Sequence, residues 1–357
     1  MKHIFICHNL VTLYKSNAFS KANNIEEVSF YIYLDYNAKI DVELSSSLFT
    51  QDRYIYAHYP YNRTAKLPYW YWKRYVKSIE KVIKKITDSE QLYLHIYLDM
   101  WAFMPTIIDN VKKMYGDSVH LYMHEEGYAM YAPPKEYTAA HYKIKRIIYT
   151  FLRLSTYGLT TYAHGNHPAI ERIYCSDPER ALKAGKKAGV KVNYEGDLFT
   201  RENTEAFLRL CGVNVLELRG LFDTYNFIFL SQPVYDIVGY DKYETFIKNL
   251  FNYLSDYKIL IKLHPRDTFN YEQFLNEDIQ LLNGIPNLLP FECLYPCVSN
   301  SRILTFNSSC CGNIEPTKKS IYMYRLFCDD EYNKICERVQ YDYTKVVIAN
   351  SYDEIRY

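Results

Sequence analysis

The stretch Tyr257-Lys-Ile-Leu-Ile-Lys-Leu-His-Pro-Arg266 decides how the rest of the chain is interpreted. Its centre, residues 259–263, is a short aliphatic run bounded by charges and a proline, which is typical of a buried parallel strand. Pro265 has no backbone donor and restricts His264 to extended geometry, so the strand is expected to end there. His264 is therefore expected at the carboxyl end of a central strand, where open α/β sheets bind ligands. The alternative is that His264 only hydrogen-bonds a loop.

Strand and helix patterns alternate on both sides of this stretch. Short apolar runs predict strands at residues 3–8, 28–34, 53–57, 92–98, 119–123, 226–230, 258–263, 303–306 and 320–322. Apolar residues spaced by three and four predict helices at residues 9–22, 69–87, 106–114, 142–154, 179–188 and 243–254. This alternation predicts an α/β fold with two doubly wound, Rossmann-like domains facing each other across a cleft, at residues 1–160 and 161–357.

Composition and missing motifs exclude several classes of protein. The net charge of +1 gives no sign of a nucleic-acid partner. Nine irregularly spaced cysteines suggest reduced thiols, and their spacing does not match that of a zinc site. No 18-residue apolar window is present, and residues 3–8 are interpreted as a first strand rather than a signal peptide. No Gly-rich nucleotide fingerprint is found, which argues against dinucleotide oxidoreductases and P-loop kinases.

The tripeptide Glu125-Glu126-Gly127 follows the expected strand at residues 119–123. Adjacent side chains point in different directions, so one carboxylate is expected to face the cleft while the other supports the loop. Gly127 permits a tight turn. A carboxylate in a closing cleft can serve as general base for a hydroxyl group. The alternative is a solvated pair of loop charges.

Two further segments fall in the second half. Ser308-Ser309 follows the expected strand at residues 303–306, and hydroxyl groups at such a position suit a phosphate. The alternative is an ordinary helix N-cap. Glu292 could accept hydrogen bonds from ribose hydroxyls, or it could be a first-turn acid favoured by the helix dipole. The order of the motifs places a base in one half and a phosphate-binding set in the other, which suits transfer of a sugar from a nucleotide.

The motif trio Glu125-Glu126-Gly127, His264-Pro265 and Ser308-Ser309 resembles that of the bacterial sialyltransferases with the GT-B fold. The opening stretch His3-Ile-Phe-Ile-Cys-His-Asn-Leu10 is similar to that of the lipooligosaccharide sialyltransferases of glycosyltransferase family 52. Two further stretches, Ile173-Tyr-Cys-Ser-Asp-Pro-Glu179 and Phe229-Leu-Ser-Gln-Pro233, are similar to the interdomain region and the first strand of the second domain. Capsule and polysialic acid enzymes share the trio. The first loop lacks the Pro-x-Gln of many relatives.

The resemblance implies an inverting transfer from CMP-sialic acid without a metal or other cofactor. It implies that Glu125 is the catalytic base, with Glu126 supporting the loop, and that His264 donates to the departing CMP phosphate. The remaining residues of the expected site bind substrate or shape the loops that do so. They are Gly127, Gln232, Pro265, Glu292, Asn307, Ser308 and Ser309. The expected acceptor is a galactose-type or sialic-acid-type hydroxyl of a bacterial surface glycan. The expected location is cytoplasmic, with contact at the inner face of the plasma membrane and oligomerisation left open.

Other functions stay open at this stage. A CDP-glycerol glycerophosphotransferase also carries a His-Pro, but such enzymes tend to place an acid before the Ser-Ser pair, where this chain has Phe306-Asn307. Another GT-B nucleotide-sugar transferase is a related alternative. From a different class, the basic helices at residues 72–86 and 142–154 suggest a non-catalytic nucleotide-sugar-binding or membrane-scaffold protein. The aromatic segment at residues 69–74 could stack nucleic-acid bases, but its helical spacing favours core packing.

Overall fold

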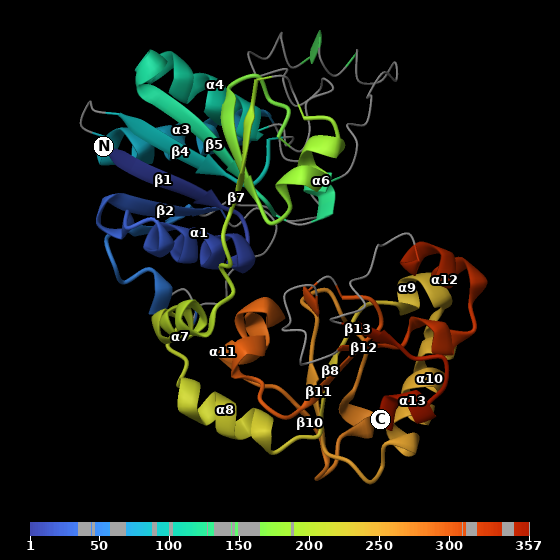
Figure 1. Cartoon of the computed structure of the whole chain (residues 1–357). Helices are drawn as coiled ribbons and strands as arrows, with labels where there is room; N and C mark the ends of the chain where they lie inside the picture. Colours follow the sequence, from blue (N-terminus) through green and yellow to red (C-terminus); the bar gives the residue numbers. More distant parts are fainter. Residues whose placement is uncertain are drawn as a thin grey trace. The chain divides into compact units, whose positions relative to one another are not determined.

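The protein is described from a computed structural model, and its α/β organisation can be followed in Figure 1. The structure describes residues 1–34, 44, 47–57, 69–87, 91–99, 103–126, 128–131, 144, 147–148, 165–186, 189–308, 310–311, 320–337 and 346–356. The chain forms two compact units, and the boundary between them falls between Leu198 and Phe199. Each unit contains one parallel sheet with helices packed against it. The predicted α/β class with two Rossmann-like units is confirmed.

The first unit contains a seven-stranded sheet. Its strands are β1 (Lys2–Cys7), β2 (Ser29–Leu34), β3 (Tyr54–Ala57), β4 (Leu92–Ile96), β5 (Val119–His124), β6 (Ile170–Cys175) and β7 (Lys191–Tyr194). They lie in the order β3-β2-β1-β4-β5-β6-β7, with parallel pairing between neighbours. The chain moves outward from β1 to β3 and then returns to the other side of β1 with β4. The direction of the strand order therefore reverses between β1 and β4.

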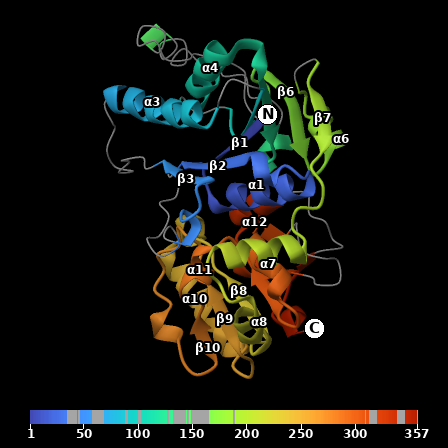
Figure 2. The same cartoon turned by 90° about the vertical axis from the view of Figure 1, so that its left-hand side faces the viewer.

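Helices cover both faces of this sheet, and the two faces differ in the side chains that they carry. The helices are α1 (Leu10–Ala22), α3 (Tyr69–Ile86), α4 (Phe103–Tyr115) and α6 (Pro178–Lys183). Figures 1 and 2 show α1 on one side of the sheet, with α3 and α4 on the other. The face toward α3 and α4 is aliphatic, with Ile4, Ile96 and Leu121 in its core. The face toward α1 carries aromatic and histidine side chains instead, because residues alternate between faces along each strand.

The second unit contains a six-stranded sheet in the order β10-β9-β8-β11-β12-β13. Its strands are β8 (Phe227–Leu230), β9 (Ile259–Lys262), β10 (Ile279–Leu281), β11 (Arg302–Thr305), β12 (Ser320–Tyr322) and β13 (Val346–Ile348). Its helices are α7 (Arg201–Leu210), α8 (Val215–Asp223), α9 (Tyr235–Val238), α10 (Tyr240–Tyr253), α11 (Ile285–Leu288), α12 (Asp330–Cys336) and α13 (Asp353–Arg356). Strand β9 is buried along its whole length and pairs in parallel with β8 and β10. This confirms the strand expected before His264.

The boundary between the units lies later than the expected position after residue 160. Strands β6 and β7 extend the first sheet beyond β5, so residues up to Leu198 pack with the first unit. Both strands carry charged residues, and β7 has only four residues, so the local pattern resembles that of a connecting region. The helix predicted at residues 179–188 is confirmed at its start, because Asp177 caps the Arg180 N–H and Pro178 occupies the first turn. It is shorter than predicted, because α6 ends at Lys183.

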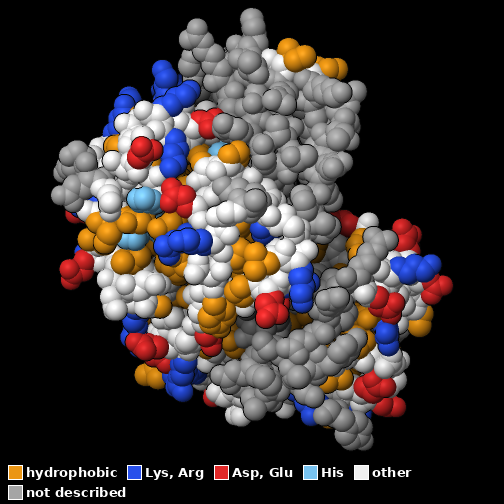
Figure 3. Space-filling view, turned by 45° about the horizontal axis from the view of Figure 1, so that its top comes forward, with side chains coloured by type: hydrophobic (Ala, Val, Ile, Leu, Met, Phe, Trp, Pro, Cys, Tyr) orange, Lys and Arg blue, Asp and Glu red, His pale blue; other side chains and the backbone are white. Residues whose placement is uncertain are grey.

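The predicted basic helix at residues 142–154 lies outside the described residues, apart from Ile144, Ile147 and Ile148. These three side chains are exposed. Among the helices that the structure describes, none combines the length and the apolar character needed to cross a membrane. Figure 3 shows acidic and basic side chains interspersed over the described part of one face, in keeping with the net charge of +1.

Candidate functional site

The predicted donor-side residues gather at one edge of the second sheet. Strands β9, β8 and β11 are adjacent and parallel, so their carboxyl ends share an edge. His264 follows β9, Gln232 follows β8, and Asn307 and Ser308 follow β11. The strand order reverses between β8 and β11, and open α/β sheets bind ligands beside such a reversal. Residues that are far apart in the sequence therefore lie along one edge of the second sheet.

His264 is half-buried and its ring is oriented by the backbone of the following turn. The Arg266 N–H donates to His264 Nδ1 at 3.1 Å, so Nδ1 acts as an acceptor and the proton of the neutral ring lies on Nε2. Burial lowers the pKa of His264, and the positive charge of Arg266 lowers it further. The ring is therefore neutral at pH 7 and offers an Nε2–H donor. Pro265 is exposed at the start of this turn.

Two consecutive residues after β8 support the neighbouring strand ends. Ser231 Oγ accepts from the His264 N–H at 2.9 Å. Gln232 Oε1 accepts from the Asn307 N–H at 2.8 Å and from Thr305 Oγ1 at 3.2 Å. Gln232 is expected to bind substrate, but its side-chain oxygen is engaged in hydrogen bonds to the end of β11. Sequence reasoning missed Ser231, although a hydroxyl residue directly after the buried run of β8 is a recognisable signal.

Ser308 lies in the expected place after β11. Its carbonyl accepts from the Tyr322 hydroxyl at 2.7 Å, and its Oγ lies 2.8 Å from Cys310 Sγ. The first contact anchors the backbone of the Ser308 turn to β12. Ser309 lies outside the described residues, as does Gly127 of the acid motif.

A buried lysine lies on β9, two residues before His264. Lys262 is 5% exposed, and its Nζ donates to the Asn287 carbonyl at 3.0 Å. Burial lowers the pKa of Lys262 to about 8, and the negative charge of Glu292 opposes this change. Glu292 itself is half-buried in the 3-10 turn Phe291–Cys293. The structure thus associates Glu292 with a cation that sequence reasoning missed, although a lysine within an apolar strand was visible.

The carboxylate of Glu125 is strongly braced at the edge of the first sheet. Its Oε2 accepts from the Ser176 N–H and the Ser176 hydroxyl, both at 2.7 Å, and also from the Tyr131 hydroxyl. Burial and the neighbouring Glu125 charge raise the pKa of Tyr131, which keeps this hydroxyl protonated as a donor. Three donors on one oxygen fix the Glu125 side chain in a single orientation.

Glu126 points to different partners. Its Oε1 lies 2.6 Å from His8 Nε2 and accepts from Asn9 Nδ2 at 3.2 Å. The side chain of Glu126 is 32% exposed, whereas that of His8 is 1% exposed. Asn9 also caps α1, because its side chain accepts from the Thr12 N–H at 2.8 Å. Glu126 therefore combines contact with a buried imidazole and access to solvent. Sequence reasoning did not select His8 or Asn9, which follow β1.

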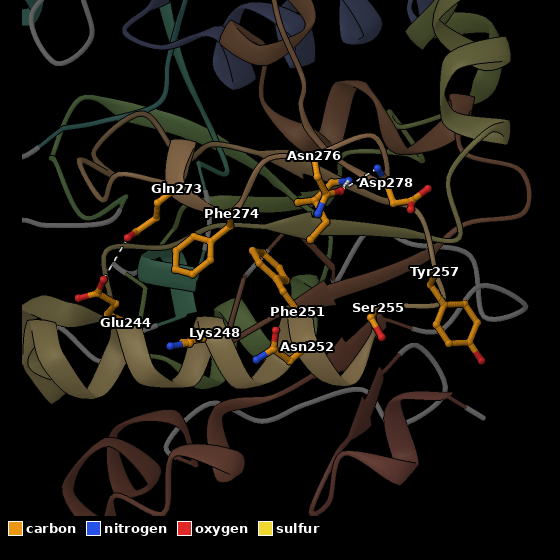
Figure 4. Close-up of a pocket in the computed structure, with 11 residues that line it drawn as sticks. Glu244, Lys248, Phe251, Asn252, Ser255, Tyr257, Gln273, Phe274, Asn276 and Asp278 are labelled. Carbon is orange, nitrogen blue, oxygen red and sulfur yellow. Dashed lines mark hydrogen bonds between the residues drawn. The ribbon is translucent and has the colours of Figure 1, made fainter.

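The described residues contain no group of three or more His, Cys, Asp or Glu side chains arranged to hold a metal ion. A separate surface hollow of about 490 Å³ lies at the amino ends of β9 and β10, where Tyr257 and Asp278 precede the strands. Figure 4 shows its polar rim, in which Gln273 Nε2 donates to Glu244 Oε1 at 3.1 Å. Because His264 follows the carboxyl end of β9, this hollow does not include the predicted site.

Sequence comparison gives no assignment: no protein-family model matches the chain, and no curated protein matches it significantly. Solved structures do match. The GT-B domain of a Photobacterium damselae sialyltransferase has a TM-score of 0.54 at 14% identity, covering 97% of this chain and 99% of that chain. The 2,6-sialyltransferase of Photobacterium sp. JT-ISH-224, solved with CMP and lactose, has a TM-score of 0.57 at 14% identity, covering 97% and 78%.

An enzyme of another activity is similar to a comparable degree. The UDP-GlcNAc 2-epimerase of Methanocaldococcus jannaschii has a TM-score of 0.52 at 13% identity, covering 99% of this chain and 91% of that chain. At such identities the likeness concerns the fold, and fold by itself does not determine function. The chain has the GT-B fold, with two parallel-sheet Rossmann-like units of the kind found in glycosyltransferases and nucleotide-sugar epimerases.

Proposed function

We propose that this protein is an inverting, metal-independent sialyltransferase that moves sialic acid from CMP-sialic acid to a hydroxyl group of a surface glycan. The observation that carries the proposal is the support given by Ser231 and Gln232 to His264 and Asn307 at the strand-order reversal of the second sheet. This edge presents an imidazole N–H after β9, and the Ser308 turn lies at the same edge after β11, with β8 between the two strands. Hydrogen-bond donors of this kind are suited to the negative charge that develops on a departing phosphate.

The donor half of the reaction is assigned to the second unit. His264, neutral with its proton on Nε2, donates a hydrogen bond to the phosphate of the departing CMP. Ser308 and Ser309 hold the same phosphate through their hydroxyl groups, and Glu292 accepts from the ribose. The hydrogen bond from the Asn307 N–H to Gln232 Oε1 holds the start of the Ser308 turn at the same edge of the sheet as His264. Loss of this support is expected to weaken CMP binding even though Gln232 need not touch the nucleotide.

The acceptor half is assigned to the acid motif of the first unit. The hydrogen bonds favour Glu126 as the base and Glu125 as the brace, the reverse of the roles implied by the motif resemblance. Glu125 Oε2 already accepts from three donors, whereas Glu126 is partly exposed and is oriented by His8. A base must reach the proton that it removes, so the accessible carboxylate is the better candidate.

The chemistry needs few protein groups. As the acceptor O–H proton passes to the carboxylate, the acceptor oxygen bonds to the anomeric carbon on the face opposite CMP. The bond from that carbon to the phosphate oxygen breaks, and its electron pair leaves with CMP. Attack on the opposite face inverts the centre, as in inverting glycosidases. CMP leaves readily when its phosphate is hydrogen-bonded, so a divalent ion is not required in this scheme.

The acceptor class follows from the motif resemblance rather than from contacts of the described residues. A galactose-type or sialic-acid-type hydroxyl on a capsule or lipooligosaccharide suits the proposal. The protein is proposed to act in the cytoplasm, in contact with the inner face of the plasma membrane.

A second candidate is a transferase or epimerase that uses a UDP-sugar. The similarity to a UDP-GlcNAc 2-epimerase, at a TM-score close to those of the sialyltransferases, favours its inclusion. Both candidates require a nucleotide at the His264 edge. The nucleotides that they use differ in the nucleobase, which is cytosine or uracil, and in the number of phosphates.

Calorimetric titration with CMP, CDP, UMP, UDP and GMP separates these candidates. CMP is expected to bind at least tenfold more tightly than UMP or UDP. A donor screen should then show release of CMP from CMP-sialic acid with lactose as acceptor, and unchanged rates in EDTA. Preference for UDP together with turnover of UDP-sugars would replace the proposal with the second candidate. Nucleotide binding without turnover of any donor would indicate a non-catalytic binding protein.

A further inference from the structure

A chain of buried polar side chains crosses the face of the first sheet that packs against α1. It begins at His3 on β1, continues through His95 on β4 and His124 on β5, and ends at Glu195 directly after β7. Lys15 of α1 completes it. All five side chains belong to residues that are 7% exposed or less. Charged groups this deep in a protein are retained only with close partners.

The distances define a continuous set of hydrogen bonds. His3 Nδ1 lies 2.9 Å from His95 Nε2, and His95 Nδ1 lies 2.8 Å from His124 Nε2. His124 Nδ1 lies 3.0 Å from Glu195 Oε1. Burial alone would raise the pKa of Glu195, but the adjacent Lys15 ammonium and His124 lower it overall. Glu195 is therefore a carboxylate and can only accept.

The direction of every hydrogen bond follows from this end point. Since Glu195 accepts, His124 Nδ1 carries a proton and its Nε2 is an acceptor. His95 must then donate from Nδ1 and accept at Nε2, so His3 also donates from Nδ1. Burial lowers the pKa of all three imidazoles, which agrees with neutral rings. The remaining His3 Nε2 is buried without a hydrogen-bond partner among the described residues, as expected at the start of such a chain.

Lys15 connects this chain to the acid motif. Its Nζ lies 2.6 Å from Glu195 Oε2 and donates to the Glu125 carbonyl at 2.6 Å. Glu195 therefore contacts His124, which precedes Glu125, and also the lysine that holds the Glu125 carbonyl. The Glu125 N–H donates to the Tyr174 carbonyl at 2.9 Å, so both backbone groups of Glu125 are fixed. The peptide that leads to Glu126 is then restricted in orientation.

We infer that Lys15 and Glu195 are positioning residues, which hold the Glu125–Glu126 segment so that the Glu126 carboxylate meets the acceptor hydroxyl. The role in transfer rests on the proposed function. Neither residue touches the substrate. A small displacement of a catalytic group can reduce the rate about 10²-fold, so an indirect support can have a large effect on kcat.

Three variants test this inference: Glu195→Gln, Lys15→Met and the double variant. Each single variant leaves one charge buried without its partner and is expected to lower Tm. The double variant removes both charges and should recover much of the Tm. Its kcat should remain at least tenfold below that of the natural protein, because the Glu125 carbonyl has lost its donor. The donor KM and the CMP Kd should change less than about twofold. Lys242→Met, which breaks the exposed pair with Asp329, is the matched control and should change neither kcat nor Tm appreciably.

A merely structural role predicts a different result, in which kcat recovers together with Tm in the double variant. That result, or wild-type kcat in both single variants, would overturn the inference. Hydrogen exchange of the Glu125 amide gives a readout that needs no turnover. Exchange should be at least tenfold faster in the double variant than in the natural protein, and unchanged exchange would also overturn the inference. If the natural protein transfers no sugar at all, the proposed function fails while this measurement still tests the positioning.

Nitrogen NMR of labelled histidine checks the geometry beneath the inference. At pH 7 three imidazoles should appear as neutral Nδ1–H tautomers, and Glu195→Gln should perturb the His124 signals most. Assignment of Nε2–H tautomers to His95 and His124 would contradict the proposed direction of the chain.

Discussion

The carboxyl edges of the two sheets both carry candidate reactive groups, but they are supported by different interactions. At the first sheet, Glu125 is held from beneath by the ion pair of Lys15 and Glu195, which is nearly inaccessible to solvent. At the second sheet, His264 is held by neutral groups, through Ser231 Oγ and the Arg266 N–H. The contrast shows that one fold can position reactive groups with a buried ion pair or with neutral hydrogen bonds.

The difference has a physical consequence. A buried ion pair is sensitive to the loss of either partner, because the remaining charge is left in a medium that solvates it poorly. A neutral hydrogen bond is worth only about 0.5–1.5 kcal/mol, and its loss is tolerated more easily. Removal of either Lys15 or Glu195 alone should therefore lower both stability and catalysis. Substitutions at the His264 edge should affect catalysis with little change in stability.

The His264→Ala variant is the sharpest test of the carboxyl edge of the second sheet. Transfer is expected to fall by about 10²–10⁴-fold, since the Nε2–H donor to the departing phosphate is removed. The Tm should change little because the ring is half-buried and its own hydrogen bond is to a backbone amide. Steady-state kcat/KM with CMP-sialic acid measures the effect. His120→Ala, which removes a surface imidazole paired with Glu171, is the control and should be near wild type. Activity of His264→Ala within a few-fold of wild type would remove this residue from the mechanism.

The acid edge is tested by comparing Glu126→Gln with Glu125→Gln. Glu126→Gln should reduce kcat by about 10²–10⁴-fold while CMP binding persists, because an amide cannot take the acceptor proton. Glu125→Gln keeps an acceptor for Ser176 and the Tyr131 hydroxyl, so a loss of about tenfold or less is expected. Single-turnover rates with saturating donor measure both. The opposite ranking would restore Glu125 as the base and make Glu126 the supporting residue.

The third and smallest effect concerns the pH dependence of stability. Burial lowers the pKa of His3 to about 4, whereas an unfolded histidine titrates near 6.5. The unfolded state therefore binds more protons between these values, so the free energy of unfolding falls as pH falls from about 6.5 to about 4. The contribution of His3 is on the order of 3 kcal/mol at most. Its neighbours in this window are His95, the chain's terminal amine and the stacked ring of Tyr93.

Urea unfolding at a series of pH values measures this slope. His3→Phe retains a ring against Tyr93 but cannot titrate, so its stability should depend less steeply on pH across the same window. An identical slope in the variant would mean that His3 does not contribute. His264 is a useful comparison because its pKa is also lowered, although its half-exposed ring is better screened by solvent and should contribute less.

Much of the fold could be predicted because its signals are local. The aliphatic run before His264 forms β9, and the apolar spacing at residues 69–87 forms α3. The boundary between the units could not be predicted in the same way. Strands β6 and β7 carry charged residues because they lie toward the edge of the sheet, so their pattern differs from that of buried strands. Their membership in the first sheet depends on pairing with β5, which no local pattern encodes.

The sequence by itself determined where strands end and which reactive residues follow them, since Pro265 and the apolar runs act on neighbouring backbone. Only the tertiary structure decided that Ser231 supports His264, which of Glu125 and Glu126 is braced, and that Lys15 meets Glu195. These properties depend on contacts between residues far apart in the chain. Such contacts depend on how the strands are ordered in the sheet and how the helices pack against it. The chemical state of a side chain is set by the groups that this packing places next to it.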